Sequence, residues 1–153
     1  TICPAGNIYT SAEQVGRFYE MLLSGGEYQG KQIMNAKTVF RSTLPTSGLS
    51  IDRTLLAPMR YALGPMLGSN PVGLFGPMTG QAFGHLGFSN ILCWADPERD
   101  ISVSILTTGK SVVGTHLPAL AKTLYQISNN CPRIPKNQRR SLFATDRTEN
   151  NLV

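Results

Sequence analysis

The sequence has few of the residues that bind metals or carry cofactors. Its 153 residues include three cysteines, Cys3, Cys93 and Cys131, and two histidines, His85 and His116. The cysteines form no Cys-x-x-Cys pair, and neither His-Glu-x-x-His nor Gly-x-Gly-x-x-Gly is present. We therefore expect no metal site and no bound cofactor. Cys3 and Cys131 could pair only if the two ends of the chain meet, which leaves the cellular compartment open.

Long apolar runs are also missing. No stretch approaches the roughly 18 apolar residues that a membrane-spanning helix needs, so we expect no membrane-embedded segment. Residues 1–7 have neither the charged start nor the apolar run of a signal peptide, and the chain starts at Thr1, so we expect it to be cut or processed. Its 41% of apolar residues could fill one core, and we place one domain over residues 1–130.

The positive charge is concentrated at the C-terminal end. Residues 1–130 carry nine Lys and Arg against seven Asp and Glu, whereas residues 131–153 carry five against two. We predict that the second segment is a basic, partly disordered tail. No aromatic residue separates the cations between Arg133 and Arg140, and Pro132 and Pro135 would interrupt a helix. Both features argue against nucleic acid as a partner.

The most important absence is that of a recognisable catalytic nucleophile. Acyl transfer needs a Ser, Cys or Thr activated by a nearby base. The chain has no Gly-x-Ser-x-Gly elbow, and none of its serines begins a Ser-x-x-Lys motif. Residues 107–110, Thr-Thr-Gly-Lys, lack the first glycine and the following helix start of a phosphate-binding loop. Cys93 alternates with Leu92 and Trp94 in a strand pattern, which favours a buried apolar role over a reactive thiol.

Three amphipathic segments predict helices. Ser11 begins Ser-Ala-Glu-Gln, a capping-box pattern, and the apolar residues that follow recur at helical spacing until Gly25-Gly26 ends the helix. A shorter helix is predicted from Asn35, as its cap, to Arg41. A third helix is predicted over residues 116–128, with Pro118 in its first turn.

Strands account for most of the remaining pattern. Residues 89–95 and 101–107 flank Asp-Pro-Glu-Arg-Asp, a sequence typical of a turn, and predict an antiparallel hairpin. We expect its acids, Asp96, Glu98 and Asp100, to be solvated and to do no acid–base work. One or two further strands are predicted between Thr43 and Gly80. Together the elements indicate an α+β domain.

The segment Phe83-Gly84-His85-Leu86-Gly87-Phe88, directly before this hairpin, is the candidate for chemistry. A histidine between two glycines can present a polar ring beside bare backbone, because glycine adds no side chain there. The alternative is that His85 only caps a turn and hydrogen-bonds the backbone. The other histidine, His116, sits where a helix begins and is expected to face solvent or to cap that helix.

The order of these motifs resembles that of the serine β-lactamase-related hydrolases, which include class C β-lactamases, DD-peptidases and family VIII esterases. The resemblance rests on residues 4–12 before the first helix, residues 21–26 at its end, residues 83–88, and Ala95-Asp96-Pro97-Glu98. It runs from about Pro4 to Ile127. It implies the C-terminal part of the β-lactamase/DD-peptidase-like fold, an antiparallel sheet packed by helices.

The resemblance also assigns roles to the candidate site. His85-Leu86-Gly87 matches the family's Lys-Thr-Gly or His-x-Gly strand motif, so His85 and Gly87 are the candidate catalytic residues. Leu86 and Phe88 are the candidate substrate-binding residues: the backbone N–H of Phe88 would serve the oxyanion hole while Gly87 leaves room for the acyl group. Tyr9, in Tyr-Thr-Ser, lies in the family's helix-entry segment, and we interpret it as structural.

The family's serine nucleophile and its mid-chain tyrosine motif are not in this sequence. The resemblance therefore implies the C-terminal half of a hydrolase of esters, amides or β-lactams, whose acyl-serine lies outside the chain. A small ester or amide is the expected substrate, and the missing N-terminal half of the fold is the expected partner. Alone, the chain is predicted to be inactive, because losing the nucleophile costs about a millionfold in turnover. The alternative is a non-catalytic binding module of the same fold.

Overall fold

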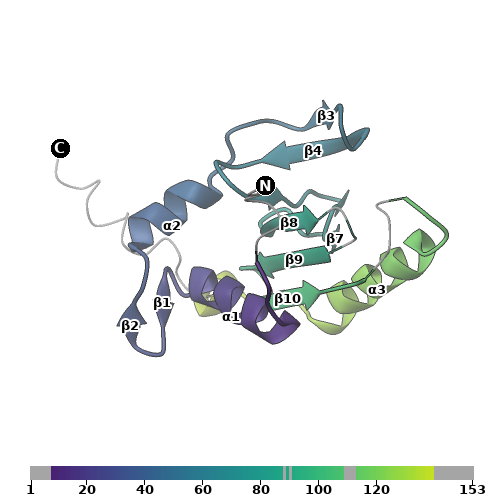
Figure 1. Cartoon of the computed structure of the whole chain (residues 1–153). Coiled ribbons are helices and arrows are strands. Elements are labelled where there is room, and N and C mark those ends of the chain that lie inside the picture. The colour runs from purple at the N-terminus through teal and green to yellow at the C-terminus, as the bar shows by residue number, and fades with distance from the viewer. Residues whose placement is uncertain (1–7, 88, 90, 109–112, 140–153) are drawn as a thin grey trace, which may run out of the picture.

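The centre of the structure, a computed structural model that describes residues 8–87, 89, 91–108 and 113–139, is a six-stranded antiparallel sheet. The strand order is β10-β9-β8-β5-β4-β3 (Figure 1). The strands are β3 (Ser50–Asp52), β4 (Ala57–Tyr61), β5 (Met66–Leu67), β8 (Phe83–Gly87), β9 (Ile91–Asp96) and β10 (Ile101–Ile105). Two small hairpins are separate from it, β1 (Glu27–Tyr28) with β2 (Lys31–Gln32), and β6 (Val72–Gly73) with β7 (Gly76–Pro77).

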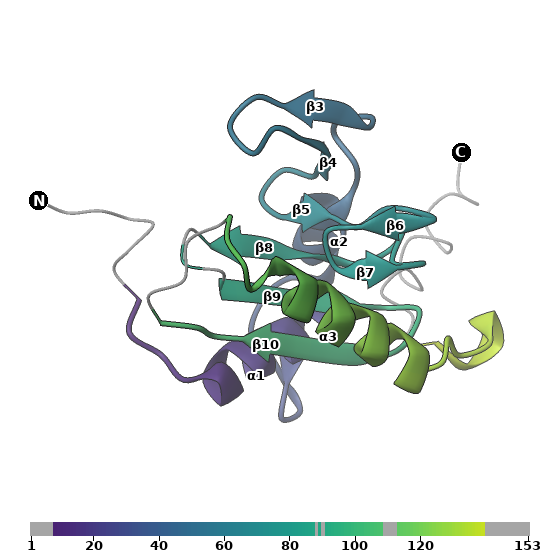
Figure 2. The same ribbon diagram turned by 90° about the vertical axis from the view of Figure 1, so that its right-hand side faces the viewer.

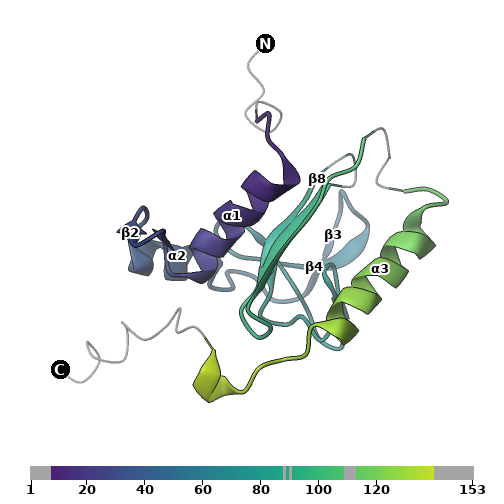
Figure 3. The same cartoon turned by 90° about the horizontal axis from the view of Figure 1, so that it is seen from below.

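Two long helices pack on opposite faces of the sheet (Figure 3). Helix α1 (Ala12–Leu23) lies against β9 and β10, and α3 (Leu117–Asn130) lies on the other face and packs against β7. Helix α2 (Ala36–Thr43) follows the β1–β2 hairpin. The predicted α+β class is confirmed, and so are the three helices, with α2 and α3 each ending two residues later than expected.

The capping box at the start of α1 is formed as predicted. The Gln14 N–H donates to Ser11 Oγ at 3.2 Å, and the Ser11 N–H donates to Gln14 Oε1 at 3.1 Å. These two bonds satisfy donors that have no partner inside the helix. At the other end, Gly25 and Gly26 adopt φ of 65° and 89°, a backbone conformation that costs glycine little.

Each face of the sheet has its own apolar cluster, because strand residues alternate between the two faces. On the α1 side, Leu22 and Leu23 of the helix pack with Phe83, Cys93 and Ala95 of the strands. The cluster on the α3 side joins strand residues at the alternate positions with Phe75 of the β6–β7 hairpin and Leu124 of α3; the strand residues are Met59, Met66, Leu92 and Trp94. Strand β9 is thus buried on both faces, and the buried apolar role predicted for Cys93 is confirmed.

The β9–β10 hairpin has the predicted pairing, but its turn is not solvated as expected. Asp96 is 1% exposed and Glu98 is 6% exposed. The reason is that residues 131–139 pack against this turn beyond the end of α3 (Figure 2). The N–H of Ile134 donates to the Glu98 carbonyl at 2.8 Å, and the Glu98 carboxylate pairs with Arg133 at 2.6 Å and Arg139 at 2.9 Å.

The region between Thr43 and Gly80 contains more strands than the sequence predicted. Five lie there, β3 to β7, and three of them have only two residues. Such short strands show no alternation of apolar and polar residues, which is why the pattern did not reveal them. Within the described ranges, no helix is both long and apolar enough to cross a membrane.

Candidate active site

The His85-Leu86-Gly87 motif forms the last three residues of β8. In the register of the sheet His85 lies opposite Cys93, whose side chain belongs to the cluster on the α1 side. Helix α1 packs mainly on β9 and β10, and His85 is exposed. The motif therefore presents its histidine to solvent from a strand whose first half, Phe83 and Gly84, is buried.

The two glycines of the motif differ in how much space there is for a side chain. A Cβ at Gly84 would collide with the Cys93 carbonyl and with Trp94, so this position requires glycine for packing. A Cβ at Gly87 would lie 3.1 Å from Cβ of Ile91, a tight contact with a single side chain. Gly87 is only half-buried, and its bare backbone lies at the end of the strand beside His85.

One edge of β8 is open at the motif. Strand β5 pairs Met66 with Gly84 and Leu67 with Phe83, and no further. Before Met66 the chain makes a tight turn, in which the Ala62 N–H donates to the Pro65 carbonyl at 2.9 Å. Within the described part of the chain, no strand pairs with His85, Leu86 and Gly87 on this side. An open backbone edge of this kind can hydrogen-bond an extended ligand.

Met66 contributes one hydrogen bond to the open edge. Its sulfur accepts the Leu86 N–H at 3.4 Å, a normal distance for a sulfur acceptor. Met66 itself is 8% exposed and belongs to the apolar cluster on the α3 side, where Leu86 also packs. Sequence reasoning missed this residue. A methionine among loop residues carries no signal of a backbone contact twenty positions away.

A second hydrogen bond fixes the chain just after the motif. The Thr107 hydroxyl donates to the Ser89 carbonyl at 2.5 Å and joins the end of β10 to the β8–β9 turn. Phe88, predicted to supply the oxyanion donor, lies outside the described residues, so its role stays a prediction. Tyr9 is 99% exposed, ahead of α1 in the chain, and His116 is the N-cap residue of α3.

Tyr61 and Asp52 form a polar pair on the strands beyond β5. The Tyr61 hydroxyl donates to Asp52 Oδ2 at 2.6 Å, while Oδ1 accepts the N–H groups of Thr54 and Leu55. The Tyr61 bond and then the two N–H groups lower the pKa of Asp52. Burial, together with the bond to Asp52, raises the pKa of Tyr61 to about 12. This tyrosine is protonated at neutral pH and holds the β3–β4 hairpin together.

The buried groups on the α1 side are not poised for chemistry. Burial raises the pKa of the Cys93 thiol, so the reactive thiolate is disfavoured. Burial, with a smaller contribution from Cys93, raises the pKa of Tyr19 to about 12. Throughout the described ranges, no group of three or more His, Cys, Asp or Glu side chains lies close enough together to hold a metal ion.

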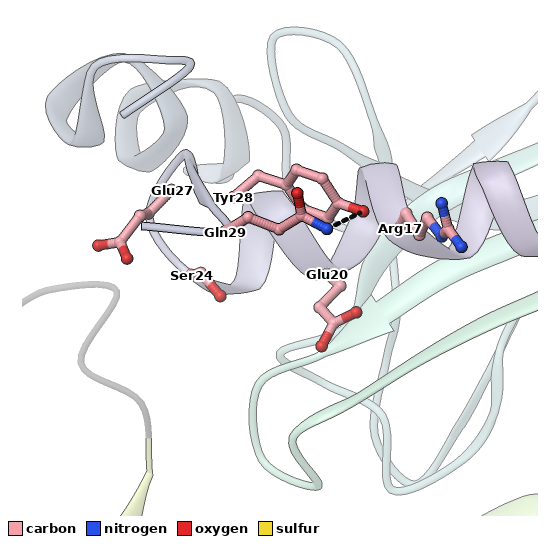
Figure 4. A pocket seen from close by; sticks show the side chains of 6 residues that line it. All are labelled: Arg17, Glu20, Ser24, Glu27, Tyr28 and Gln29. Carbon is pink, nitrogen blue, oxygen red and sulfur yellow. Dashed lines mark hydrogen bonds between the residues drawn. The ribbon is translucent and has the colours of Figure 1, made fainter. Parts of the chain in front are cut away.

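A surface pocket of about 410 Å³ lies away from the motif, between α1 and the β1–β2 hairpin (Figure 4). Its lining residues are Arg17, Glu20, Ser24, Glu27, Tyr28 and Gln29. The carboxylates of Glu20 and Glu27 point in different directions, so they do not converge on one point (Figure 4). The pocket therefore offers no constellation that would act with His85.

Comparison with known proteins identifies the family. The family model described as "Beta-lactamase" matches residues 2–124. The chain belongs to this family. The β-lactamase-family chain is also 29% identical over 103 residues to "Esterase/beta-lactamase LipL" of Mycobacterium tuberculosis (strain ATCC 25618 / H37Rv), a match that covers 67% of the chain and 23% of LipL. The predicted membership of the β-lactamase-related hydrolases is confirmed.

Two solved structures share the fold of this β-lactamase-family chain. A penicillin-binding protein homologue from Caulobacter crescentus aligns with a TM-score of 0.58 and 22% identity, over 67% of the chain and 26% of its own length. A family VIII carboxylesterase aligns with a TM-score of 0.59 and 20% identity, over 77% of the chain and 31% of its own length. The chain thus spans less than a third of the length of each of these relatives.

Proposed function

We propose that this chain forms one wall of the active site of a serine hydrolase that acts on small esters, amides or β-lactams through an acyl-serine. The nucleophilic serine and its base come from outside these 153 residues, from an N-terminal half of the same fold. The observation that carries the proposal is the His85-Leu86-Gly87 motif on an open strand edge, with His85 exposed. The family match and the absence of any Ser-x-x-Lys motif in the sequence support it.

The reaction assigns separate work to the two halves. The serine Oγ attacks the substrate carbonyl carbon while its proton passes to the base, and the carbonyl oxygen becomes an oxyanion. Backbone N–H groups at the end of β8, with Phe88 as the candidate donor, would stabilise that charge. The bond to the alcohol or amine then breaks, and the leaving group takes the proton. Water hydrolyses the acyl-serine and restores the serine hydroxyl.

In this scheme His85 and Gly87 contact the reacting groups from the strand side. The exposed ring of His85 can donate a hydrogen bond to the substrate or relay the proton to the leaving group. Gly87 adds no side chain that would fill the space of the acyl group, and Leu86 supplies apolar contact. Amides and β-lactams would use the same groups, since all three substrates pass through a tetrahedral oxyanion.

The edge strand β10 supports the idea that another segment completes the sheet. It ends the six-stranded sheet in the described part of the chain, yet it carries no proline, lysine or other charge that would protect an edge. Its apolar residues Ile101, Val103 and Ile105 alternate with serines, and all five residues are only half-exposed. These are the features of an interior strand. A strand from the missing half would pair with it.

The test is to express the protein together with the segment encoded upstream of Thr1 and to treat it with a fluorescent β-lactam and a fluorophosphonate probe. We expect covalent labelling of a serine in the upstream segment, identified by mass spectrometry, and hydrolysis of p-nitrophenyl butyrate. The 153-residue chain alone should remain unlabelled. Replacing the labelled serine by alanine should abolish both signals. An upstream sequence without Ser-x-x-Lys, or a full-length protein that takes up neither probe, would instead favour a non-catalytic binding module.

A further inference from the structure

The bond between the Met66 sulfur and the Leu86 N–H lies at the point where β8 loses its neighbouring strand. Up to Gly84, β8 is held on both sides, by β9 and by β5. From His85 onward it is held by β9 alone among the described strands, apart from this one bond at 3.4 Å. A strand paired on one side only can twist more strongly than one held on both sides.

We propose that Met66 is a positioning residue of the hydrolase site: its thioether sets the twist of β8 at His85-Leu86-Gly87 without closing the strand edge. This inference rests on the proposed function and adds a residue to that same site. Met66 does not contact the substrate. It acts through Leu86, whose backbone lies between the two candidate catalytic residues.

The geometry of the β4–β5 turn explains why a side chain, and not a strand carbonyl, accepts the Leu86 N–H. Continuing the β5–β8 register would place Gly64 opposite Leu86. The turn from Ala62 to Pro65 occupies that part of the chain, so no backbone carbonyl of β5 is available there. An unsatisfied N–H in this half-buried place would be costly, and the methionine sulfur reaches it from the apolar cluster.

The nature of the acceptor also matters for the site. A strand carbonyl from a continued β5 would bring a whole backbone beside His85 and Gly87 and would exclude a ligand from that edge. A thioether on a buried side chain satisfies one N–H and adds no backbone, so the edge stays accessible. The weak acceptor is thus compatible with an open site.

The test combines Met66→Leu with a matched control, Met59→Leu. Leucine keeps the apolar volume and removes the sulfur acceptor, and such swaps are usually well tolerated. Met59 is buried in the same cluster but lies on β4, one strand further from β8. Labelling the unmutated protein with selenomethionine provides the conservative variant, because selenium keeps an acceptor at this position.

The first measurement is amide hydrogen exchange at Leu86 in the 153-residue chain, by nuclear magnetic resonance. We expect Met66→Leu to lower the protection of this amide by about tenfold, with no comparable change in Met59→Leu or in the selenomethionine protein. Equal protection of the Leu86 amide in Met66→Leu and in the unmutated chain would show that the sulfur does not accept this hydrogen bond. An equal loss in both leucine variants would also overturn it, because the effect would then come from the core.

The second measurement is the kinetics of the full-length hydrolase. Met66→Leu should lower kcat by about tenfold with KM unchanged, and selenomethionine should retain the rate of the unmutated protein. Unchanged kcat despite a less protected Leu86 amide would overturn the positioning role. An unmutated protein with no acyl-serine would overturn the proposed function and the positioning role together. The hydrogen-exchange result would still show whether the bond between Met66 and Leu86 forms. Failure of the proposed function and failure of the hydrogen bond are therefore distinguishable.

Discussion

The guanidinium of Arg99 lies 2.7 Å from the carboxylate of Asp96, and both side chains are almost completely buried, at 5% and 1% exposure. Arg99 also donates to the carbonyls of Met78 and Cys131, at 2.9 and 3.0 Å. One cation therefore joins the β9–β10 turn to the chain after β7 and to the end of α3. A charge in such a place depends on its counter-charge.

Replacing Asp96 by asparagine should therefore destabilise the fold strongly. It leaves a buried guanidinium without its counter-charge, which typically costs about 3 to 5 kcal/mol. Urea denaturation followed by circular dichroism would measure the loss. The double variant Asp96→Asn with Arg99→Met should recover part of it, because the unpaired charge is removed. A loss below about 1 kcal/mol in the single variant would show that the pair is not desolvated as described.

Glu98 should hold residues 131–139 against the turn. In Glu98→Gln the carboxylate that pairs with Arg133 and Arg139 is lost, so this segment should open more often. Trypsin cleavage after Arg133 should then be about tenfold faster than in the unmutated chain. Glu13→Gln is the control, because its partner Arg17 is exposed and far less depends on that pair. Equal cleavage rates in all three proteins would contradict the docked segment.

The same contact should weaken in acid. Burial alone would raise the pKa of Glu98, but the hydrogen bonds and charges of Arg133 and Arg139 outweigh it and lower the pKa below the ordinary value of 4.5. A carboxyl whose pKa is lower in the folded state stabilises the fold fully above the unfolded value, and this contribution is lost as the pH falls through the folded value. Unfolding free energies should therefore fall with pH below about 4.5 in the unmutated chain, and less steeply in Glu98→Gln. Parallel pH curves would argue against this ion pair.

Glycine at position 84 should be required by packing. Gly84→Ala would push a methyl group into the Cys93 carbonyl and Trp94, and we expect a loss of about 2 kcal/mol in unfolding free energy. Gly48→Ala is a matched control, because a Cβ there meets nothing within 4 Å, and it should change stability by less than about 0.5 kcal/mol. Thermal melting of both variants would compare them. A stable Gly84→Ala would mean that β8 and β9 can separate locally.

His85→Ala tests the candidate site itself. His85 is exposed, so its removal should leave the melting temperature of the full-length protein unchanged. If the ring takes part in proton transfer, acylation should slow by about a hundredfold. Stopped-flow acylation with a chromogenic ester would measure the rate. Unchanged kinetics with an intact fold would favour the alternative role of His85, which is only to cap a turn and hydrogen-bond the backbone.

Local sequence signals predicted the elements that local interactions build. Ser11 and Gln14 predicted the start of α1, because both partners of the capping box lie within four residues of sequence. The residues of the β9–β10 turn predicted that hairpin. The family resemblance predicted that His85-Leu86-Gly87 lies on a strand of the sheet, and the motif forms the end of β8. All of these signals lie within short stretches of chain.

The rest depends on contacts between distant segments. The sequence predicted a solvated turn at Glu98, because no residue near Glu98 indicates that Arg133 and Arg139 cover it in the fold. Met66 was overlooked for the same reason, since its sulfur meets an N–H twenty residues away. Strands of two residues, such as β5, exist only because their neighbours in the sheet hold them.

The stacking of Phe75 on Trp94 has a practical consequence for unfolding measurements on this chain. The rings lie 5.5 Å apart at an angle of 20°, and Trp94 is the single tryptophan of the chain. Its indole is 1% exposed within the layer that α3 covers. Tryptophan emission from the 153-residue chain therefore comes from one known location. A red shift would report that water has entered beneath α3, so the molecule contains its own optical probe for that layer.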